Sequence, residues 1–116
     1  MKTFKTHPIG IAQGDAQIFA DFENDGEMWT GSGTRERRHA VTFDQPFRST
    51  PAVQVGISLW DVDTSAAVRA EVVAESITPD GFDIVFRTWA DSRVARARVA
   101  WMAIGDVTTD DDWDVP

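Results

Sequence analysis

The sequence predicts an all-β fold, a six-stranded antiparallel β-sandwich, and three observations support this prediction. Apolar residues recur at every second position and not with helical spacing. Short stretches rich in Gly, Pro, Asp and Ser separate the alternating segments and favour turns. No stretch has the pattern of an amphipathic helix. Two sheets packed over their aliphatic faces account for all three observations.

Six segments are predicted as strands. Each follows a turn-forming stretch and alternates apolar with polar or small residues. The turn TPDG at 78–81 suits a tight hairpin, because Pro79 fixes φ and Gly81 is free to adopt a positive φ. In chain order the predicted strands are 16–22, 39–43, 52–61, 68–77, 81–89 and 93–105.

The alternation also predicts which side chains face the core. In the first strand Ile18 and Ala20 are expected opposite Phe19 and Asp21. The strand at 52–61 should align Val53, Val55, Ile57 and Leu59 on one face. The strand at 81–89 should point Phe82, Ile84 and Phe86 inward. Three tryptophans are also expected in the core: Trp29, Trp60 and Trp101.

Length and composition limit the possible functions. The 116 residues suffice for one domain. The net charge of -8 opposes nucleic-acid binding, which depends on neutralising phosphates. The absence of cysteine excludes disulfides, thiolate metal sites and cysteine nucleophiles. No apolar run suits a membrane span or a conventional export signal. We therefore expect a soluble protein without membrane insertion, nucleic-acid partner or cofactor, and its location stays open.

The composition divides the chain into three parts. A short N-terminal segment at 1–11 precedes the predicted sandwich at 12–105. The stretch 106–116, DVTTDDDWDVP, contains five aspartates and is predicted to be an acidic tail. Clustered aspartates can bind calcium, but the spacing and the distal glutamate of an EF-hand loop are missing. The tail interpretation is therefore preferred.

Arginine and glutamate alternate with apolar residues on two of the predicted strands. Arg69, Glu71 and Glu75 belong to the strand at 68–77, and Arg96 and Arg98 belong to the last strand. Cross-strand pairs on a solvated face explain them. The alternative is that these faces meet around a symmetry axis between copies. The basic cluster RERR at 35–38 has the same two interpretations, a solvated strand face or an ion pair between subunits.

The stretch VTFDQPFRSTPAVQVGISLWDVD, followed by VRAEVVAESITPDGFDIVFRTWADSRVARARVAWMAIG, resembles the H-type lectin domain. The matching features are the TF..PF...P.V.V.I...D run, the arginine that opens the next strand, the IT..GF turn, the TW hairpin and the W.AIG ending. Together they span about residues 35–105, and the strand AQGDAQIF extends the match to residue 12. The order and spacing of these pieces make the resemblance specific.

The resemblance implies a homotrimer, with a dimer of trimers as a larger form. It also implies clefts between subunits that bind galactose- or N-acetylgalactosamine-type glycans. One subunit would supply a loop, and its neighbour would supply an arginine and the hairpin tryptophan with the residue that follows it. By position the loop is Thr30, Gly31, Ser32 and Gly33, and the neighbour's residues are Arg69, Trp89 and Ala90.

Two positions depart from the family pattern. The family loop carries an aspartate where this chain has Ser32, and Ala90 replaces the family histidine. A carboxylate accepts sugar hydroxyls more strongly than a serine does. Asp91, one residue further along the turn, can compensate. The resemblance therefore implies glycan binding with altered specificity.

The residue types themselves suit a sugar, which presents paired hydroxyls and one face of C–H groups. Arg69 offers a fork of donors and Trp89 a flat surface. Asp91 and Ser92 offer an acceptor and a hydroxyl at a hairpin tip. The structural alternatives are that Trp89 caps the end of the sandwich and that Arg69 pairs with Glu71 or an aspartate.

Three function classes follow from these residues. The first is a multivalent lectin, since a trimer gains avidity on close-set glycans. The second is a trimeric structural or attachment protein with no sugar ligand. An enzyme is not expected, because His7 and His39 are the only histidines and belong to no catalytic motif. Asp61 and Asp63 resemble a glycosidase pair only in residue type.

Overall fold

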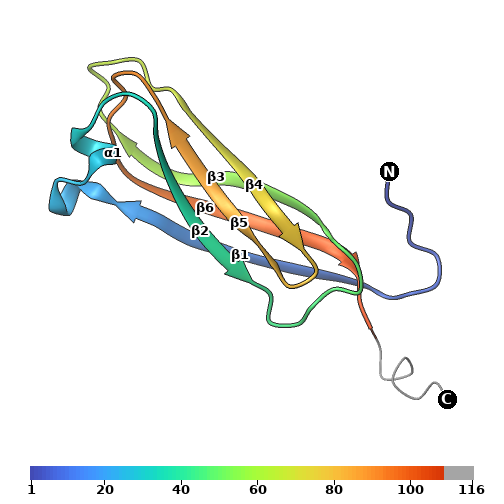
Figure 1. Cartoon of the computed structure of the whole chain (residues 1–116). Helices are drawn as coiled ribbons and strands as arrows, with labels where there is room; N and C mark the ends of the chain where they lie inside the picture. The colour runs from blue at the N-terminus through green and yellow to red at the C-terminus, as the bar shows by residue number, and fades with distance from the viewer. Residues whose placement is uncertain (109–116) are drawn as a thin grey trace.

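The computed structural model describes residues 1–108, which form a sandwich of two three-stranded antiparallel sheets (Figure 1). One sheet has the order β1-β6-β3 and the other β2-β5-β4. The all-β antiparallel prediction is confirmed. The strands are β1 (Ile9–Ala20), β2 (Arg35–Thr42), β3 (Ala52–Val62), β4 (Ala70–Thr78), β5 (Gly81–Thr88) and β6 (Val94–Asp106).

Two strands begin earlier than predicted. β1 starts at Ile9, within the segment assigned to the N-terminus, and pairs with β6 along its whole length. Small residues occupy the inward-facing positions in the first part of β1. At Gly14, for example, an added Cβ would lie 2.8 Å from the Trp101 ring. Small inward residues give a weak hydrophobic signal. β2 starts at Arg35 because its pairing with β5 continues to Thr88. The predicted tail lies outside the described residues from 109 onward.

Two short helical turns connect β1 to β2 and were not predicted. They are η1 (Asp21–Asn24) and α1 (Glu27–Thr30), and four residues are too few to show a helical period. Asp21 is buried, and its carboxylate accepts hydrogen bonds from Met28 N at 2.9 Å and from Arg37 at 2.8 Å. Asp21 therefore joins both turns to β2.

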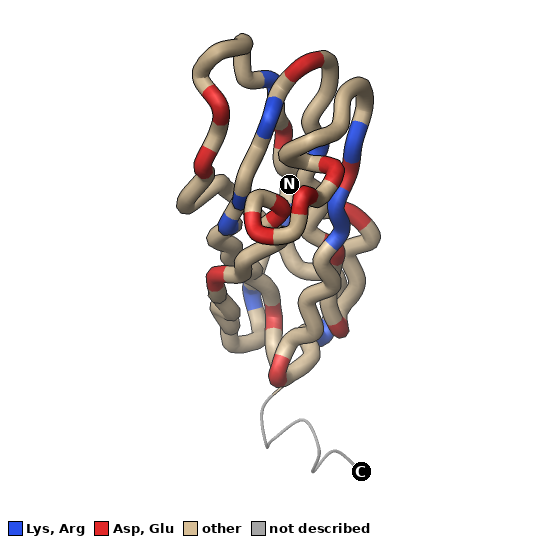
Figure 2. Tube along the Cα trace, turned by 90° about the vertical axis from the view of Figure 1, so that its left-hand side faces the viewer, with Lys and Arg blue, Asp and Glu red and all other residues tan. Residues whose placement is uncertain are grey.

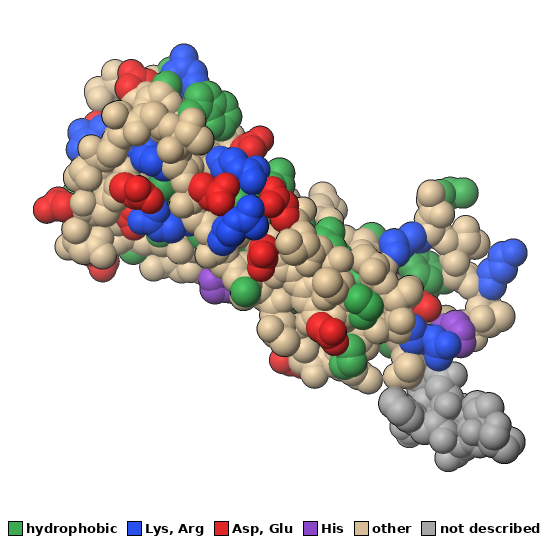
Figure 3. All heavy atoms as spheres, in the orientation of Figure 1, with side chains coloured by type: hydrophobic (Ala, Val, Ile, Leu, Met, Phe, Trp, Pro, Cys, Tyr) green, Lys and Arg blue, Asp and Glu red, His purple; other side chains and the backbone are tan. Residues whose placement is uncertain are grey.

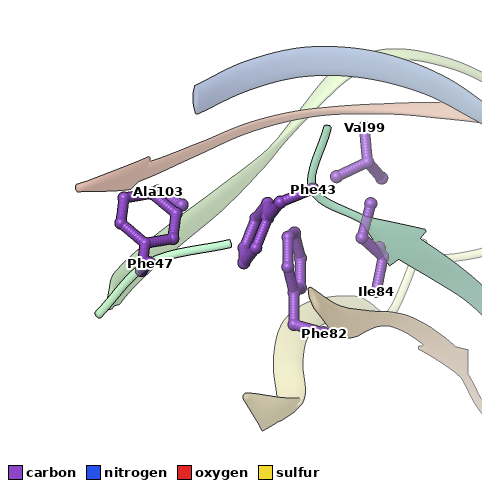
Figure 4. Close-up of a cluster of buried hydrophobic side chains, with 6 residues drawn as sticks. All are labelled: Phe43, Phe47, Phe82, Ile84, Val99 and Ala103. Atoms are coloured by element: carbon purple, nitrogen blue, oxygen red, sulfur yellow. The ribbon is translucent and has the colours of Figure 1, made fainter. Parts of the chain in front are cut away.

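The core has two parts. The larger cluster contains Phe43, Phe47, Phe82, Ile84, Val99 and Ala103 (Figure 4). The smaller one contains Phe19, Met28, Phe86, Val94 and Ala97, and it lies under the helical turns. The predicted inward set on β5 is confirmed, since Phe82, Ile84 and Phe86 are all buried. Trp101 packs against the larger cluster as expected.

Two β-bulges change the faces predicted from strict alternation. In β1 the register shifts between Gln17 and Phe19, so Ile18 and Phe19 both contact the core. In β3 it shifts between Ile57 and Leu59. Val53 and Val55 pack on the core, whereas Ile57 is exposed. The core prediction is wrong for two tryptophans: Trp60 is 44% exposed on the edge strand β3, and Trp29 is half-buried and belongs to neither core cluster.

The turn at 78–81 needs its glycine for a different reason from the one predicted. Gly81 has no positive φ. An added Cβ would lie 2.1 Å from the carbonyl oxygen of Val41, so the close approach of β2 requires glycine. The positive φ in this region belongs to Ser76, beside a register shift between Glu75 and Thr78.

The charged faces of β4 and β6 lie in different sheets, so their charges do not pair with each other across neighbouring strands. Each finds its partners within its own sheet. Basic and acidic residues are interspersed along the trace in Figure 2, and their side chains lie together on the face drawn in Figure 3. On the β2-β5-β4 sheet, Arg87 contacts Glu36 at 2.9 Å and Glu75 at 2.7 Å. On the other sheet Arg96 pairs with Asp61, and Arg98 lies 3.5 Å from Asp15. Within one chain, the charged residues thus form ion pairs on solvated sheet faces, as the first interpretation predicted. The alternative, that these faces meet around a symmetry axis between copies, stays a prediction.

Two ends of the sandwich can be distinguished. The helical turns and the β5–β6 hairpin lie at one end, and the N-terminus and the end of β6 lie at the other (Figure 1). Among the described residues no helix has the length and apolarity that a membrane span requires. Within residues 1–108, no cluster of His, Cys, Asp and Glu forms a metal site.

Candidate functional site

The β5–β6 hairpin carries the predicted tryptophan at the α1 end of the molecule. β5 ends at Thr88 and β6 begins at Val94, so a five-residue turn (89–93) joins them. Ala90 has a φ of 59°, in the left-handed region. Trp89 is 39% exposed and belongs to neither core cluster. The turn therefore presents the indole to solvent, and Phe86 fills the core beneath it instead.

Arg69 lies beside this turn, immediately before β4. Its Nη1 is 3.6 Å from Oδ1 of Asp91, and both side chains are largely exposed. The alternative partner Glu71 contacts Arg87 instead, at 3.2 Å. Of the two pairings suggested by the sequence, the one with an aspartate is therefore observed. The loose pair leaves most donors of the Arg69 fork directed to solvent.

Ser92 has a structural role and not the ligand-binding role expected from its place at the hairpin. It is 1% exposed. Its hydroxyl accepts a hydrogen bond from Arg69 N at 2.8 Å and donates one to the carbonyl of Ala67 at 3.1 Å. Thr88 adds a bond from its hydroxyl to the Arg69 carbonyl at 2.6 Å. These buried hydroxyls hold the backbone of Arg69 against the hairpin.

The predicted loop at 30–33 contacts the same hairpin within one chain. Gly33 has a φ of 76° and donates its N–H to the Ala90 carbonyl at 2.9 Å. An added Cβ at Gly31 would lie 2.4 Å from the Glu27 carbonyl, so this position requires glycine. The Thr30 hydroxyl donates toward carbonyls of the preceding turn, at Asp25 and Gly26. Ser32 is exposed between the two glycines.

Arg35 joins the loop to the hairpin, and sequence reasoning missed it. It is 5% exposed, and its guanidinium donates to five backbone carbonyls. The closest contacts are Ser92 O at 2.8 Å and Gly33 O at 2.9 Å. The others are Glu27 O, Met28 O and Ala90 O. The available signal was the alternation of β2, which places Arg35 on the inward face with Val41.

The carboxylates considered as a glycosidase pair are each held by an arginine. Asp61 pairs with Arg96. Asp63 accepts from Ser65 N at 2.9 Å and lies 3.1 Å from Arg93, and these contacts lower the pKa of its carboxyl. A general acid needs a raised pKa, so Asp63 is poorly suited to that role.

Comparison with known proteins identifies the family. The family model of the H-type lectin domain matches residues 38–104, more than half of the chain. The chain belongs to the H-type lectin domain family. This membership supports a carbohydrate-binding lectin module, in a family of binding domains and not of enzymes.

Three relatives show how far this H-type lectin domain resembles known proteins. "ATP synthase subunits region ORF 7" of Fuscovulum blasticum is 52% identical over 107 residues, which cover 92% of this chain and 93% of that protein. A discoidin-1 polypeptide of Dictyostelium discoideum is 32% identical over 86% of this chain. The solved structure of recombinant discoidin II from the same organism has a TM-score of 0.76 at 26% identity over 91% of this chain. The chain spans about 40% of the length of these discoidins.

The matched region of the H-type lectin domain includes only part of the candidate site. Arg69 and the hairpin residues Trp89, Ala90 and Asp91 lie inside it. The loop at 30–33 precedes its first residue, Arg38. The structure nevertheless brings the loop and the hairpin together, through Gly33 and Arg35.

Proposed function

We propose that this H-type lectin domain binds galactose- or N-acetylgalactosamine-type glycans, with altered specificity, in clefts between the subunits of a homotrimer. The observation that carries the proposal is the exposed indole of Trp89 beside the Arg69–Asp91 pair. An indole packs against the C–H face of a sugar. A guanidinium and a carboxylate next to it supply donors and acceptors for adjacent hydroxyls.

The proposed change in specificity follows from two substituted positions. Ser32 and Ala90 stand where the family pattern has an aspartate and a histidine. Asp91 restores a carboxylate, but it lies on the hairpin beside Arg69 and not on the loop. The acceptor therefore approaches the sugar from the same side as the guanidinium. We expect such a site to discriminate between hydroxyl configurations differently from a site with a carboxylate on the facing loop.

The proposed trimer is supported by the outer face of the β1-β6-β3 sheet. Ile9, Ile11 and Met102 are exposed on this face, and Ile11 stands opposite Ile104 in the register. A group of exposed apolar residues on one sheet face is typical of a protein–protein contact. We propose that three copies join near this face and that the hairpin of each copy lies beside the loop of a neighbour.

A glycan array with purified protein tests the proposed binding site. Trp89→Ala should abolish the signal on galactose-type glycans while the secondary structure and the assembly stay unchanged. Trp60→Ala is the matched control, because Trp60 is similarly exposed and lies on β3 outside the hairpin. Equal binding by wild type and the Trp89 variant would show that the hairpin is not the site.

The mass in solution tests the proposed assembly. We expect a mass three times that of the chain, or six times for a dimer of trimers. Ile11→Asp should yield single copies, because it places a charge in the apolar contact. Ala40→Asp, on the outer face of the other sheet, should leave the mass unchanged. A wild-type monomer at micromolar concentration would contradict the trimer and the clefts together.

A trimeric attachment protein without a sugar ligand is the second candidate. Two observations favour it: the Ser92 hydroxyl is buried and already hydrogen-bonded, and the Ala90 side chain has no polar atom. A stable trimer that binds no glycan on a broad array would support it.

A further inference from the structure

A hollow of about 380 Å³, separate from the candidate site, lies at the α1 end of the sandwich. The ends of β1, β3 and β6 form its floor, with Ala20, Val62 and Ala95. The helical turns form one wall. No residue of the loop at 30–33 or of the hairpin at 89–91 lines it, so it is distinct from the candidate site. Its volume is within the range of small-ligand pockets, about 300 to 1,000 Å³.

Two aromatic rings form a corner of this hollow. The rings of Phe22 and Trp29 have centroids 5.4 Å apart and an interplanar angle of 76°. Arg93 fixes Trp29, because its guanidinium lies 4.3 Å from the ring centroid and its Nε donates to the Trp29 carbonyl at 2.9 Å. The corner is therefore already formed without a ligand, which lowers the entropic cost of binding.

Phe22 supplies the open surface of the corner. It is 62% exposed, although its neighbour Asp21 is buried. The Asp21 carboxylate is held inward by Met28 N and Arg37, so the next residue of the turn points toward solvent. The same contacts that fix η1 thus hold a phenyl ring at the edge of the hollow.

The opposite side of the hollow is polar. Asp61 and Arg96 form an ion pair there, and both side chains are about half exposed. The pair uses Nε of Arg96, one of the five N–H donors of a guanidinium. Glu23, also exposed, adds a further carboxylate to the lining. Donors and acceptors therefore stand side by side, facing an apolar floor and an aromatic corner.

We infer that this hollow is a second carbohydrate site, which takes a pyranose ring with its C–H face against Phe22 and its hydroxyls at Asp61 and Arg96. Two carboxylates beside one arginine disfavour an anionic ligand. Because Asp61 is paired with Arg96, only the exposed carboxylate of Glu23 is left to attract a cation, and an exposed ion pair is worth little. A wholly apolar ligand would desolvate the ion pair without replacing its bonds to water. A neutral polyol with one apolar face matches both surfaces. The inference rests on the proposed function, because it assigns a ligand of the same class to a second place.

The consequence is two sites at one end of each chain. Trp29 directly precedes the loop at 30–33, so the hollow and the proposed cleft are adjacent along the chain. A glycan with several sugar units, or neighbouring glycans on one surface, can then engage both sites. The second contact becomes intramolecular and raises the avidity.

Indole N–H resonances in a two-dimensional ¹H–¹⁵N spectrum distinguish the two sites, because Trp29 reports on the hollow and Trp89 on the hairpin. The full chain is titrated with galactose, N-acetylgalactosamine, glucose and mannose. We expect at least one of these sugars to shift the Trp29 resonance with saturation. Phe22→Ala should weaken that response about tenfold, since it removes the stacking surface. Ile57→Ala, an exposed apolar residue on β3 that does not line the hollow, is the control and should leave it unchanged.

The outcomes separate the two proposals. A shift at Trp89 alone supports the hairpin site and overturns the second one. A shift at Trp29 alone, sensitive to Phe22→Ala and to Arg96→Gln, supports the hollow and contradicts the hairpin site. A Trp29 shift that depends on protein concentration without sugar would mean that a second copy fills the hollow, and it overturns the inference. A sugar response at Trp29 that Phe22→Ala and Arg96→Gln both retain in full also overturns the inference.

Discussion

The two ends of the sandwich are closed in different ways. At the end near the N-terminus, aromatic rings fill the space between the sheets: Phe43 lies 5.0 Å from Phe47 and 5.8 Å from Phe82, and Trp101 packs against both Phe43 and Phe82. At the α1 end the core is smaller, and buried polar side chains connect the loops. The proposed glycan-binding residues all lie at this second end.

The difference shows how a stable scaffold can carry a defined site. Burial of aromatic rings stabilises the fold in proportion to area, but it has little directional preference. Hydrogen bonds to backbone carbonyls are directional and fix the positions of the segments that they join. Arg35 and Ser92 do this for the loop at 30–33 and for Arg69. The aromatic end thus supplies stability, and the polar end supplies geometry.

The largest expected effect is on stability at the aromatic end. Phe82→Ala removes a ring that is almost fully buried and touches two other aromatics. We expect the free energy of unfolding to fall by about 3 to 5 kcal/mol, measured by urea denaturation with tryptophan fluorescence. Glycan binding below the unfolding transition should persist, because the site is at the other end. If the free energy of unfolding falls by less than about 1 kcal/mol, the surrounding side chains must have moved to fill the cavity left by the ring.

A smaller loss of stability, with a loss of binding, is expected at the polar end. Arg35→Leu leaves five carbonyls without their charged donor, and we expect the free energy of unfolding to fall by about 2 to 3 kcal/mol. The loop and the hairpin should separate, so the glycan signal should disappear even where the protein is folded. Arg38→Leu, on the exposed outer face, is the control. Unchanged binding by the Arg35 variant would show that the loop needs no such tie.

Ser92→Ala should have a weaker effect of the same kind. It removes the acceptor for Arg69 N and the donor to Ala67 O, both buried, at a cost of about 1 to 2 kcal/mol. Thermal denaturation measures this loss, and the Trp89 indole resonance should broaden as Arg69 becomes less ordered. Ser32→Ala changes an exposed serine of the loop and should leave the melting temperature unchanged.

The smallest effect concerns pH and the charged outer face of the β2-β5-β4 sheet. Hydrogen bonds from Arg87, and then from Arg38, lower the pKa of both Glu36 and Glu75 below the ordinary glutamate value of 4.5. Groups with a lowered folded pKa stabilise the fold above their unfolded pKa, and this contribution is lost as the pH falls through the folded value. Acid should therefore destabilise the protein below about pH 4.5.

Arg87→Gln removes the largest cause of both shifts. The melting temperature of this variant should fall less than that of the wild type between pH 6 and pH 3. Parallel curves for the two proteins would mean that these ion pairs contribute no acid sensitivity, in keeping with their exposure to solvent.

Much of the fold could be predicted because alternation acts on every residue of a strand. The six strands and the inward Phe82, Ile84 and Phe86 follow from it directly. The bulges in β1 and β3 could not be predicted, since a shift by one residue leaves no periodic trace. Trp60 is exposed on the edge strand β3, on the face opposite the inward valines, and was assigned to the core from its residue type alone. The four-residue turns η1 and α1 were missed for a similar reason.

Some residues of the candidate site could likewise be predicted from the sequence, and others could not. Arg69 and Trp89 could be identified from residue type and from the resemblance, and the structure places both at one end. The roles of Arg35 and Ser92 could not, because their partners are distant in sequence: Arg35 bonds to a carbonyl 57 residues away. A hydroxyl at a hairpin tip suits either ligand binding or structural support, and the burial of Ser92 identifies the structural role.

The placement of the chain's beginning has a practical consequence for measurement. Met1 and the last residues of β6 leave the sandwich at the end farthest from the helical turns and the hairpin (Figure 1). Immobilisation through an N-terminal tag therefore orients the hairpin away from the sensor surface. Glycans in the flow can then reach every tethered copy without passing the support.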